Sequence, residues 1–590
     1  MAAARGRRKT FALVLIKPSH YDDDGYVIQW LRSAIPSNTL AALYGLAVDC
    51  AERRILGDDV DIEIISYDET NIRIRPERIA RRIARADGGM VGLVGVQSNQ
   101  YPRAMDIARR LRRRGVQVCI GGFHVSGTLA MLPEMPPELR EAQALGISLF
   151  AGEAEGRLDE VLRDASNGTL KPLYNFMADL PGLEGTPVPI LPAQRVQRTT
   201  GHLTSFDAGR GCPFQCSFCT IINVQGRKSR RRSADDIEQI IRRNVAQGVN
   251  RFFITDDNFA RNKDWEPIFD RLIALREGAG MDIKFVIQVD TLCHRIPRFI
   301  EKAGRAGVAR VFIGLESINP DSLLAAKKRQ NRITEYRKML LDWKRVGATT
   351  YAGYIIGFPG DTPESLLRDI EIIKRELPLD LLEFFCLTPL PGSEDHLNLY
   401  KQGVAMDPDL NKYDLEHVTT AHAKMSAAEW EALYRRAWEI FYSPEHIETV
   451  LRRAAATGIS AGKTLFLMLW FYGSVFAEKV HPLQGGYFRL KSRRDRRPTL
   501  PLENPAIFYP RYLAELIAKH AHMARVIWKF MRIRRNIRHD AQAKNYMDQA
   551  IAPVADDELD TLEMFGTNDA AKAAVTKARR EESARARIGA

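Results

Sequence analysis

The chain has 590 residues, of which 45% are hydrophobic, and a formal net charge of +13. This length and composition predict a globular protein of about three to four domains with well-filled cores. The odd total of seven cysteines and the lack of an opening signal peptide argue against a secreted disulfide scaffold and favour the cytoplasm. The basic charge would suit a polyanion, but Lys and Arg are partly concentrated in short segments, so nucleic acid is not an expected partner.

The first predicted domain covers residues 8–165 and alternates apolar strands with helical segments. Strands are expected at 11–18, 60–68, 90–98, 116–122 and 147–153, and helices at 39–54, 76–87 and 101–115. This alternation predicts an α/β fold with a doubly wound, Rossmann-like parallel sheet, whose ligands bind beyond the carboxyl ends of the strands. The residues that it places around such a pocket are Lys17, Pro18, Ser98, Gly121, Gly122, His124 and Gly152. His124 fits a ligand contact and a histidine satisfied by backbone hydrogen bonds equally well.

Residues 166–200 are rich in Pro, Gly and Asn and predict a linker to a second domain at 201–415. The six strands expected there are LTSFDAGRG, RFFITDDNF, DIKFVIQVDT, VARVFIGLES, TYAGYIIGFPG and LLEFFCLTPLPG. Six strand-helix units predict a partial (β/α)6 barrel, in which the chemistry belongs at the carboxyl ends of the strands. The candidate residues at those ends are Asp256, Asp257, Asn258, Gln288, Asp290, Glu316, Gly357 and Pro359.

Three cysteines follow the first barrel strand, in GRGCPFQCSFC. Cys212, Cys216 and Cys219 have the spacing CxxxCxxC, and Phe218 stands before the last of them. Three thiolates this close together can bind three irons of a four-iron cluster and leave the fourth iron open to a small chelating molecule. A structural zinc would need a fourth ligand at similar spacing, and no Cys or His follows soon after Cys219.

This motif resembles the signature of the radical S-adenosylmethionine (SAM) superfamily. The resemblance implies a radical SAM barrel that cleaves SAM reductively, with an electron donor such as flavodoxin or ferredoxin, to a deoxyadenosyl radical that abstracts hydrogen from an unactivated carbon. It implies SAM contacts by Phe218, Asp256, Asp257, Asn258, Gln288, Asp290, Glu316, Gly357 and Pro359. Asp256 or Asp257 would accept from the SAM ammonium group, and backbone near Gly357 would approach the adenine.

The upstream domain, with GGFHVSG followed by GEAEG, resembles the cobalamin-binding domain of the class B methylase-like subgroup of that superfamily. This resemblance implies cobalamin held by Ser98, Gly121, Gly122, His124 and Gly152, and a methyl transfer to the substrate. The DxHxxG motif that supplies a lower axial histidine is absent, because the loop after the first strand reads KPSHYDDDGY. Cobalamin would therefore be bound without this ligand, or the domain would have lost the cofactor.

Beyond residue 420 the pattern predicts an all-α domain at 420–552 and a flexible tail at 553–590. The apolar run at 465–477 is too short to span a bilayer, which needs about twenty residues. It fits a buried core helix or a cover over the active-site mouth. With the basic aromatic stretch VIWKFMRIRRNIR it also fits contact with an anionic membrane surface, which a hydrophobic substrate would favour.

The leading functional prediction is a cobalamin-dependent radical SAM enzyme that methylates a carbon of a small molecule. The second is a radical SAM cyclase or rearranging enzyme without cobalamin, and the third is a non-enzymatic iron-sulfur protein that binds nucleic acid. Nothing in the sequence names the substrate, because one fold and one cluster serve many different reactions.

Overall fold

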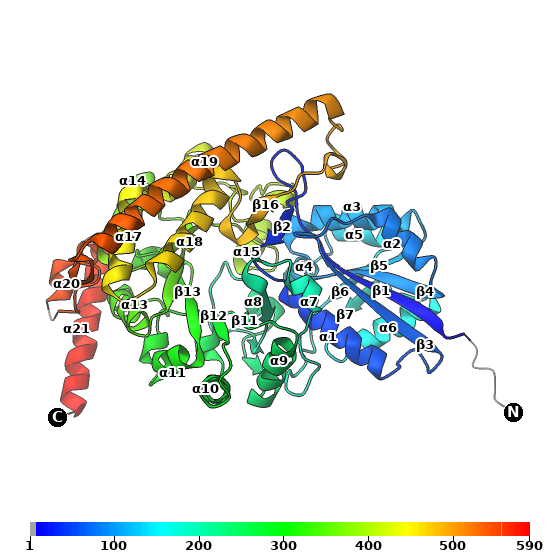
Figure 1. Ribbon diagram of the computed structural model, residues 1–590, viewed down its shortest axis with the longest axis horizontal. Coiled ribbons are helices and arrows are strands. Elements are labelled where there is room, and N and C mark those ends of the chain that lie inside the picture. Colours follow the sequence, from blue (N-terminus) through cyan, green and yellow to red (C-terminus); the bar gives the residue numbers. More distant parts are fainter. Residues whose placement is uncertain (1–6, 556, 590) are drawn as a thin grey trace.

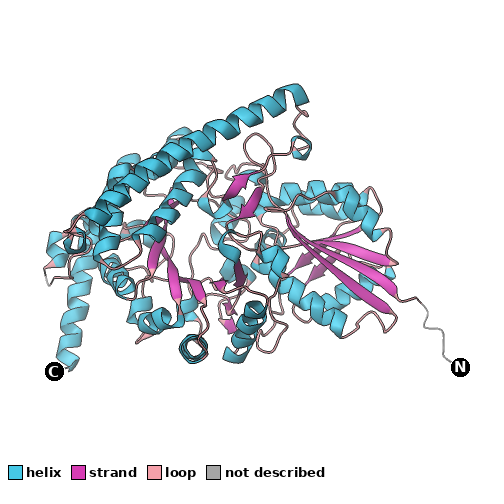
Figure 2. Cartoon of the chain, in the orientation of Figure 1, coloured by secondary structure: helices cyan, strands magenta, loops and turns pink. Residues whose placement is uncertain are grey.

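A computed structural model describes residues 7–555 and 557–589 of the chain. It contains two six-stranded parallel sheets, and Figure 2 shows them as two separate groups of strands surrounded by helices. This arrangement confirms the predicted α/β fold with a doubly wound sheet before a partial barrel.

The N-terminal sheet has the strand order β3-β1-β4-β5-β6-β7, and all neighbouring strands are parallel. Its strands are β1 (Lys9–Lys17), β3 (Val60–Asp68), β4 (Gly88–Leu93), β5 (Gln117–Gly121), β6 (Ser148–Ala151) and β7 (Leu173–Asn175). Because β3 and β4 flank β1 on opposite sides, the chain reverses its winding direction between β1 and β4. Open α/β sheets bind their ligands at such a switch point.

Helices cover both faces of this sheet. On one face α1 (Asn38–Glu52) and α6 (Leu158–Asn167) bury apolar side chains against it. On the other face lie α2 (Pro76–Ile83), α3 (Tyr101–Arg112), α4 (Phe123–Met131) and α5 (Pro137–Ala144). Strand order and the right-handed crossover decide which side of the sheet each helix covers, and the apolar period of the helix decides which of its faces packs on the sheet.

The segment expected to be a linker also contributes to this sheet. Its three-residue strand β7 pairs with β6 at the edge, although no alternating pattern marks it in the sequence. The other regular element there is the short helix α7 (Ala193–Val196).

The second sheet has the order β15-β14-β13-β12-β11-β8 and is also parallel throughout. Its strands are β8 (Leu203–Phe206), β11 (Arg251–Ile254), β12 (Lys284–Val289), β13 (Val308–Glu316), β14 (Thr349–Ile356) and β15 (Leu381–Cys386). The helices packed outside are α9 (Ala234–Ala246), α10 (Trp265–Ile273), α11 (Phe299–Ala306), α13 (Tyr336–Arg345) and α14 (Pro363–Glu376). The edge strands β8 and β15 are not paired with each other, so the barrel is open on one side.

The C-terminal part is mainly helical, as predicted. Its long helices are α16 (Ala427–Phe441), α17 (Pro444–Ala456), α18 (Ala461–Tyr472) and α19 (Pro505–His539), and α19 crosses the molecule beside α17 and α18 (Figure 1). It is not purely helical, because β16 (Gly486–Arg489) pairs antiparallel with β2 (Trp30–Ser33) from the N-terminal domain. No helix in the described part of the chain has an apolar stretch long enough to cross a membrane.

Residues 557–589, where we predicted a flexible tail, are largely helical in the structure. They contain α20 (Glu558–Thr561) and α21 (Asp569–Gly589), and α21 contacts the barrel helix α12 (Pro320–Ala325). Met564, Phe565 and Ala571 are buried in the same apolar core as the barrel. The few apolar residues of this segment were too widely spaced to predict that packing from sequence.

Candidate functional site at the junction of the two sheets

The cysteine loop is anchored to the ends of two barrel strands. After β11, Asp256 accepts hydrogen bonds from the backbone N–H groups of Ala208 (2.7 Å) and Gly209 (2.8 Å), and from Asn262 Nδ2 (3.0 Å). Its side chain is buried, and burial raises its pKa to about 7. Asp256 therefore fixes the start of the cysteine loop, with both oxygens occupied by protein donors. Of the two acidic residues expected to face SAM, Asp257 is the one that opens into a cavity.

Cys212, Cys216 and Cys219 lie between the short strand β9 (Gly209–Arg210) and the helix α8 (Ile221–Val224), and their thiols are free. The Cys219 N–H donates to the Cys216 carbonyl at 3.2 Å, so these two share a tight turn. Gln330 Nε2 donates to Cys216 Sγ at 3.5 Å. Burial, together with Asp257 and the neighbouring cysteines, raises the pKa of Cys212 to about 11 and of Cys219 to about 12.

This donor set fits an iron-sulfur cluster. Buried thiols that raise one another's pKa ionise when bound cations supply positive charge, and the irons of a cluster do so. Within residues 7–555 and 557–589, no three His, Cys, Asp or Glu side chains are arranged to hold a single metal ion. A four-iron cluster has no such requirement, because each thiolate binds a different iron.

The mouth cavity, as we call the space between the carboxyl ends of the two sheets, has a volume of about 550 Å³. Thr255 and Asp257 line it from the barrel, and Lys17 and Ser98 line it from the N-terminal sheet. The Asp257 side chain is exposed to the cavity but lies deep in the molecule, and this desolvation raises its pKa to about 7. An ammonium group bound in the cavity would favour the ionised carboxylate through a charge-assisted hydrogen bond.

A buried lysine beside the cysteines is the main feature that sequence analysis missed. Lys328 Nζ forms an ion pair with Glu316 and lies 5.7 Å from the ring centroid of Phe218. Burial opposes its charge, but Glu316, Cys216 and Cys219 together raise its pKa above the usual value. Glu316 has a φ of +63°, a strained conformation for a residue with a side chain. In the sequence, Lys328 belongs to the basic run KKRQN and resembles a surface lysine.

Three other predicted SAM contacts are engaged by protein groups. Asn258 Nδ2 donates to Asp290 Oδ2 at 2.8 Å, and Arg261 donates to both oxygens of Asp290 at 2.6 and 2.8 Å. Gln288 Nε2 donates to the Asp256 carbonyl at 3.3 Å. These bonds connect the ends of β11 and β12, so these side chains support the rim of the barrel.

Gly357 and Pro359 form the turn after β14. Gly357 has a φ of +110°, and a side chain there would meet the Trp430 ring of α16. Asp361 Oδ2 accepts from the N–H groups of Gly357 (3.0 Å) and Phe358 (2.9 Å), while Pro359 is exposed. The glycine is therefore required by the helix packed behind the turn. Contact of this turn with adenine stays a prediction.

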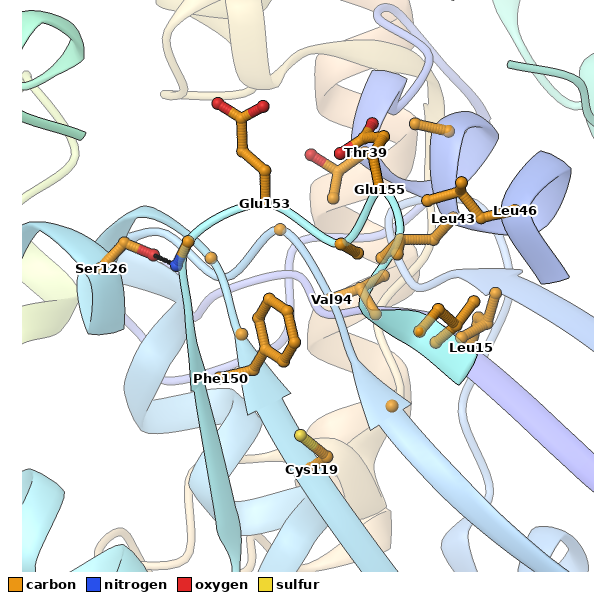
Figure 3. A pocket seen from close by; sticks show the side chains of 18 of the residues that line it. Leu15, Thr39, Leu43, Leu46, Val94, Cys119, Ser126, Phe150, Glu153 and Glu155 are labelled. Carbon is orange, nitrogen blue, oxygen red and sulfur yellow. Dashed lines mark hydrogen bonds between the residues drawn. The ribbon is translucent and has the colours of Figure 1, made fainter. Parts of the chain in front are cut away.

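A second cavity, the apolar slot, lies at the switch point of the N-terminal sheet and has a volume of about 180 Å³. Figure 3 shows Leu15, Leu43, Leu46, Val94 and Phe150 around it. Three of the predicted glycines, Gly121, Gly122 and Gly152, also line it. The slot and the mouth cavity adjoin, since both are lined by Asn38, Thr39, Gly95, Phe123, Arg210 and Gln225.

The two remaining predicted cobalamin residues differ in position. Ser98 lines the mouth cavity. His124 is fully buried, with its ring centroid 4.4 Å from that of Tyr101 and its Nδ1 3.2 Å from Ser98 Oγ. Burial lowers its pKa to about 3, so the ring is neutral. Its packing agrees with the alternative of a core histidine.

A buried ionic network joins the slot to the cysteine loop. Arg210, two residues before Cys212, donates to Glu153 (2.7 Å) and Glu155 (2.7 Å) of the GEAEG segment. Asp207 Oδ2 lies 3.2 Å from Arg210 Nε. All of these side chains are at most 10% exposed. The network holds the N-terminal domain and the cluster loop in one fixed geometry.

Comparison with known proteins agrees with this architecture. Residues 208–373 match the model of the radical SAM superfamily. The chain is 28% identical over 349 residues to bacteriochlorophyllide d C-8(2)-methyltransferase of Chlorobaculum tepidum, covering 56% of this chain and 73% of that protein. It is 26% identical over 337 residues to hopanoid C-2 methylase of Rhodopseudomonas palustris, covering 55% of this chain and 61% of that protein.

Among solved structures, the cobalamin-dependent SAM radical enzyme OxsB with aqua-cobalamin bound is similar, with a TM-score of 0.51 and 14% identity. The similarity covers 95% of this chain and 84% of OxsB, so the order of the domains is shared along nearly the whole chain. The CxxxCxxC loop follows the first barrel strand and lies inside the residues that match the superfamily model. Residues 208–373 therefore form a domain of the radical SAM superfamily, and the chain as a whole shares the fold of OxsB.

Proposed function

We propose that this protein is a cobalamin-dependent radical SAM methyltransferase that methylates an unactivated carbon of a small molecule. The observation that carries the proposal is the shared wall between the apolar slot and the mouth cavity, because Arg210, at the start of the cysteine loop, lines both cavities. The named activities of the two methyltransferase relatives support the same reaction class.

The residues present fit the three groups that this reaction needs. Cys212, Cys216 and Cys219 would hold the cluster, and Asp257 would hold the SAM ammonium group. The glycine-lined slot and the mouth cavity would hold cobalamin at the switch point. When bound, these groups supply the electron, the radical and the methyl group, and a small electron-transfer protein such as flavodoxin or ferredoxin would reduce the cluster.

The protein's own contribution is positioning and exclusion of water. The Arg210 network fixes the distance between the slot and the cysteine loop, and Asp256 fixes the loop to β11. Lys328 places a buried positive charge beside the thiolates and, with its neighbour Glu316, closes the barrel side of the site. Such preformed charges need no reorganisation during the reaction.

The test is anaerobic reconstitution with iron, sulfide and hydroxocobalamin, followed by metal analysis and mass spectrometry of the SAM products. We expect about four irons and one cobalt per chain. After reduction with SAM we expect 5′-deoxyadenosine, and S-adenosylhomocysteine only when cobalamin is present. Iron and deoxyadenosine without cobalt would favour a radical SAM enzyme without cobalamin, and no SAM cleavage would contradict both.

A matched pair of variants locates the cobalamin. Leu43 and Leu56 are both half-buried leucines packed against the same apolar core, but of the two Leu43 lines the slot. Leu43→Trp should lose most of the cobalt and keep the iron, because the larger ring fills the slot. Leu56→Trp should keep both metals. Equal cobalt loading of the two variants would place cobalamin elsewhere.

A further inference from the structure

A third cavity lies inside the barrel at the amino ends of its strands, opposite the mouth cavity. We call it the lower cavity; its volume is about 780 Å³. Phe253, Val286 and Tyr351 line it from the strands, and Leu467 and Trp470 line it from α18. This position shows what α18 covers: it closes the amino end of the barrel, not the mouth over the cysteines as one of our alternatives predicted.

The lining of the lower cavity is apolar inside and basic around it. Arg251 and Lys284 stand on paired positions near the starts of β11 and β12, and Lys463 and Arg534 come from α18 and α19. Arg310 of β13 also lines the cavity, between Lys284 of β12 and Tyr351 of β14. Burial lowers the pKa of Arg310 below its usual value. This distribution suits a ligand with an apolar body and an anionic end.

One polar group inside the lower cavity lacks a partner. Glu383 of β15 is 1% exposed, and within the described residues its buried Oε2 has no hydrogen-bond partner. Burial raises its pKa to about 8, so the carboxyl group is mostly protonated at neutral pH and can donate a hydrogen bond. A buried polar atom left unpaired costs free energy, which a bound polar group would recover.

The lower cavity approaches the mouth cavity along the open side of the barrel. Ala34, Ile35 and Leu483 line both cavities. Phe253 of β11 lines the lower cavity, and Thr255, which directly follows β11, lines the mouth cavity; two residues of extended chain span about 6.6 Å. A molecule in the lower cavity can thus extend past these side chains, so that its reacting carbon lies in the mouth cavity.

We propose that the lower cavity binds the distal part of the substrate, and that the substrate is an elongated, mainly apolar molecule with an anionic end group held at the basic rim. This inference rests on the proposed function for the position of the reacting carbon. Glu383 would bind a polar atom of the apolar body, and Lys463 and Arg534 would bind the anionic end.

The test uses the full-length, reconstituted enzyme and isothermal titration with dodecanoate below its micelle concentration. We expect saturable binding of one dodecanoate per chain, and much weaker binding of dodecanol and of dodecyltrimethylammonium. Inorganic phosphate should not displace dodecanoate, because it lacks the apolar body. Displacement of dodecanoate by phosphate would overturn the proposal. Equal binding of dodecanoate, dodecanol and dodecyltrimethylammonium would overturn it as well.

Two pairs of variants locate the binding. Leu467 and Leu469 are both half-buried on α18, but of the two Leu467 lines the lower cavity. Leu467→Trp should weaken dodecanoate binding about tenfold or more, and Leu469→Trp should not change it. Arg534→Gln should weaken binding about three- to fivefold, while Arg535→Gln on the exposed side of the same helix should not.

Iron and cobalt contents and SAM cleavage without substrate are measured on the same samples. All four variants should keep these values, which shows that they fold and load their cofactors. Equal dodecanoate binding by Leu467→Trp and Leu469→Trp would overturn the substrate proposal while leaving the proposed function intact. If the unmodified enzyme bound no cobalt on reconstitution, or did not cleave SAM, the proposed function would instead be overturned.

Discussion

Replacing Gly357 by alanine should destabilise the barrel strongly, because two independent costs meet at this residue. A Cβ atom there would lie 1.8 Å from Trp430 Cζ2, and the Trp430 ring is buried with its Nε1 bonded to the Ile356 carbonyl at 3.0 Å. The ring cannot move without losing that bond. Overpacking costs about 1–3 kcal/mol and the positive φ about 1–2 kcal/mol, so we expect a loss of roughly 2–5 kcal/mol.

The assay is thermal unfolding followed by tryptophan fluorescence, where each kcal/mol lowers the melting temperature by about 2–4 °C in a domain of this size. Gly360→Ala is the matched control, because Gly360 is exposed and its Cβ would enter open space. In a Trp430→Leu background the cost of Gly357→Ala should fall to the backbone contribution alone. Equal melting of Gly357→Ala and Gly360→Ala, or an unchanged cost in the Trp430→Leu background, would refute this reasoning.

Three further predictions concern the cluster and the network behind it. Cys219→Ala should lose most of the reconstituted iron, whereas Cys386→Ala, a buried thiol bonded to a backbone carbonyl, should keep it; equal iron contents would contradict the ligand assignment. Arg210→Met should lower the free energy of unfolding by about 3–5 kcal/mol and release cobalamin, because it leaves Glu155 buried without its cation and Glu153 paired with Arg230 alone. Melting curves and cobalt analysis test this prediction, and retained cobalamin would show that the role of Arg210 is purely local. Arg210 lowers the pKa of Glu155 below 4.5 despite burial, so this pair stabilises the fold above pH 4.5 and loses its effect as the pH falls through the lowered value. The stability difference between the unmodified enzyme and Glu155→Gln should therefore shrink in denaturant titrations as the pH falls below the usual glutamate pKa, and a constant difference would exclude the linkage.

Much of the fold was predictable because the relevant signals are local. Apolar runs of strand length alternating with helical periods predicted both parallel sheets, and the spacing of Cys212, Cys216 and Cys219 predicted the cluster loop. The strand ends were also located well enough to bring Asp257, Ser98 and Gly121 to the walls of two adjoining cavities. β7, which has only three residues, and the packing of α21, which has few apolar residues, were beyond this reasoning.

The sequence by itself thus determined the order of the strands and helices, since this follows from patterns within a few tens of residues. It predicted the cofactors through the family that the cysteine motif resembles, and it predicted a site at the carboxyl ends of the strands. Only the tertiary structure decided which polar groups are free. Asp256, Asn258 and Asp290 are occupied by protein partners, while Lys328 enters the site from a segment that resembles ordinary surface charge. Arg210 belongs to the cysteine motif itself, but its partners Glu153 and Glu155 come from the other domain. The tertiary structure also decided that α18 closes a cavity at the amino end of the barrel. Burial and pairing of a charged side chain depend on residues distant in sequence, and no local pattern encodes them.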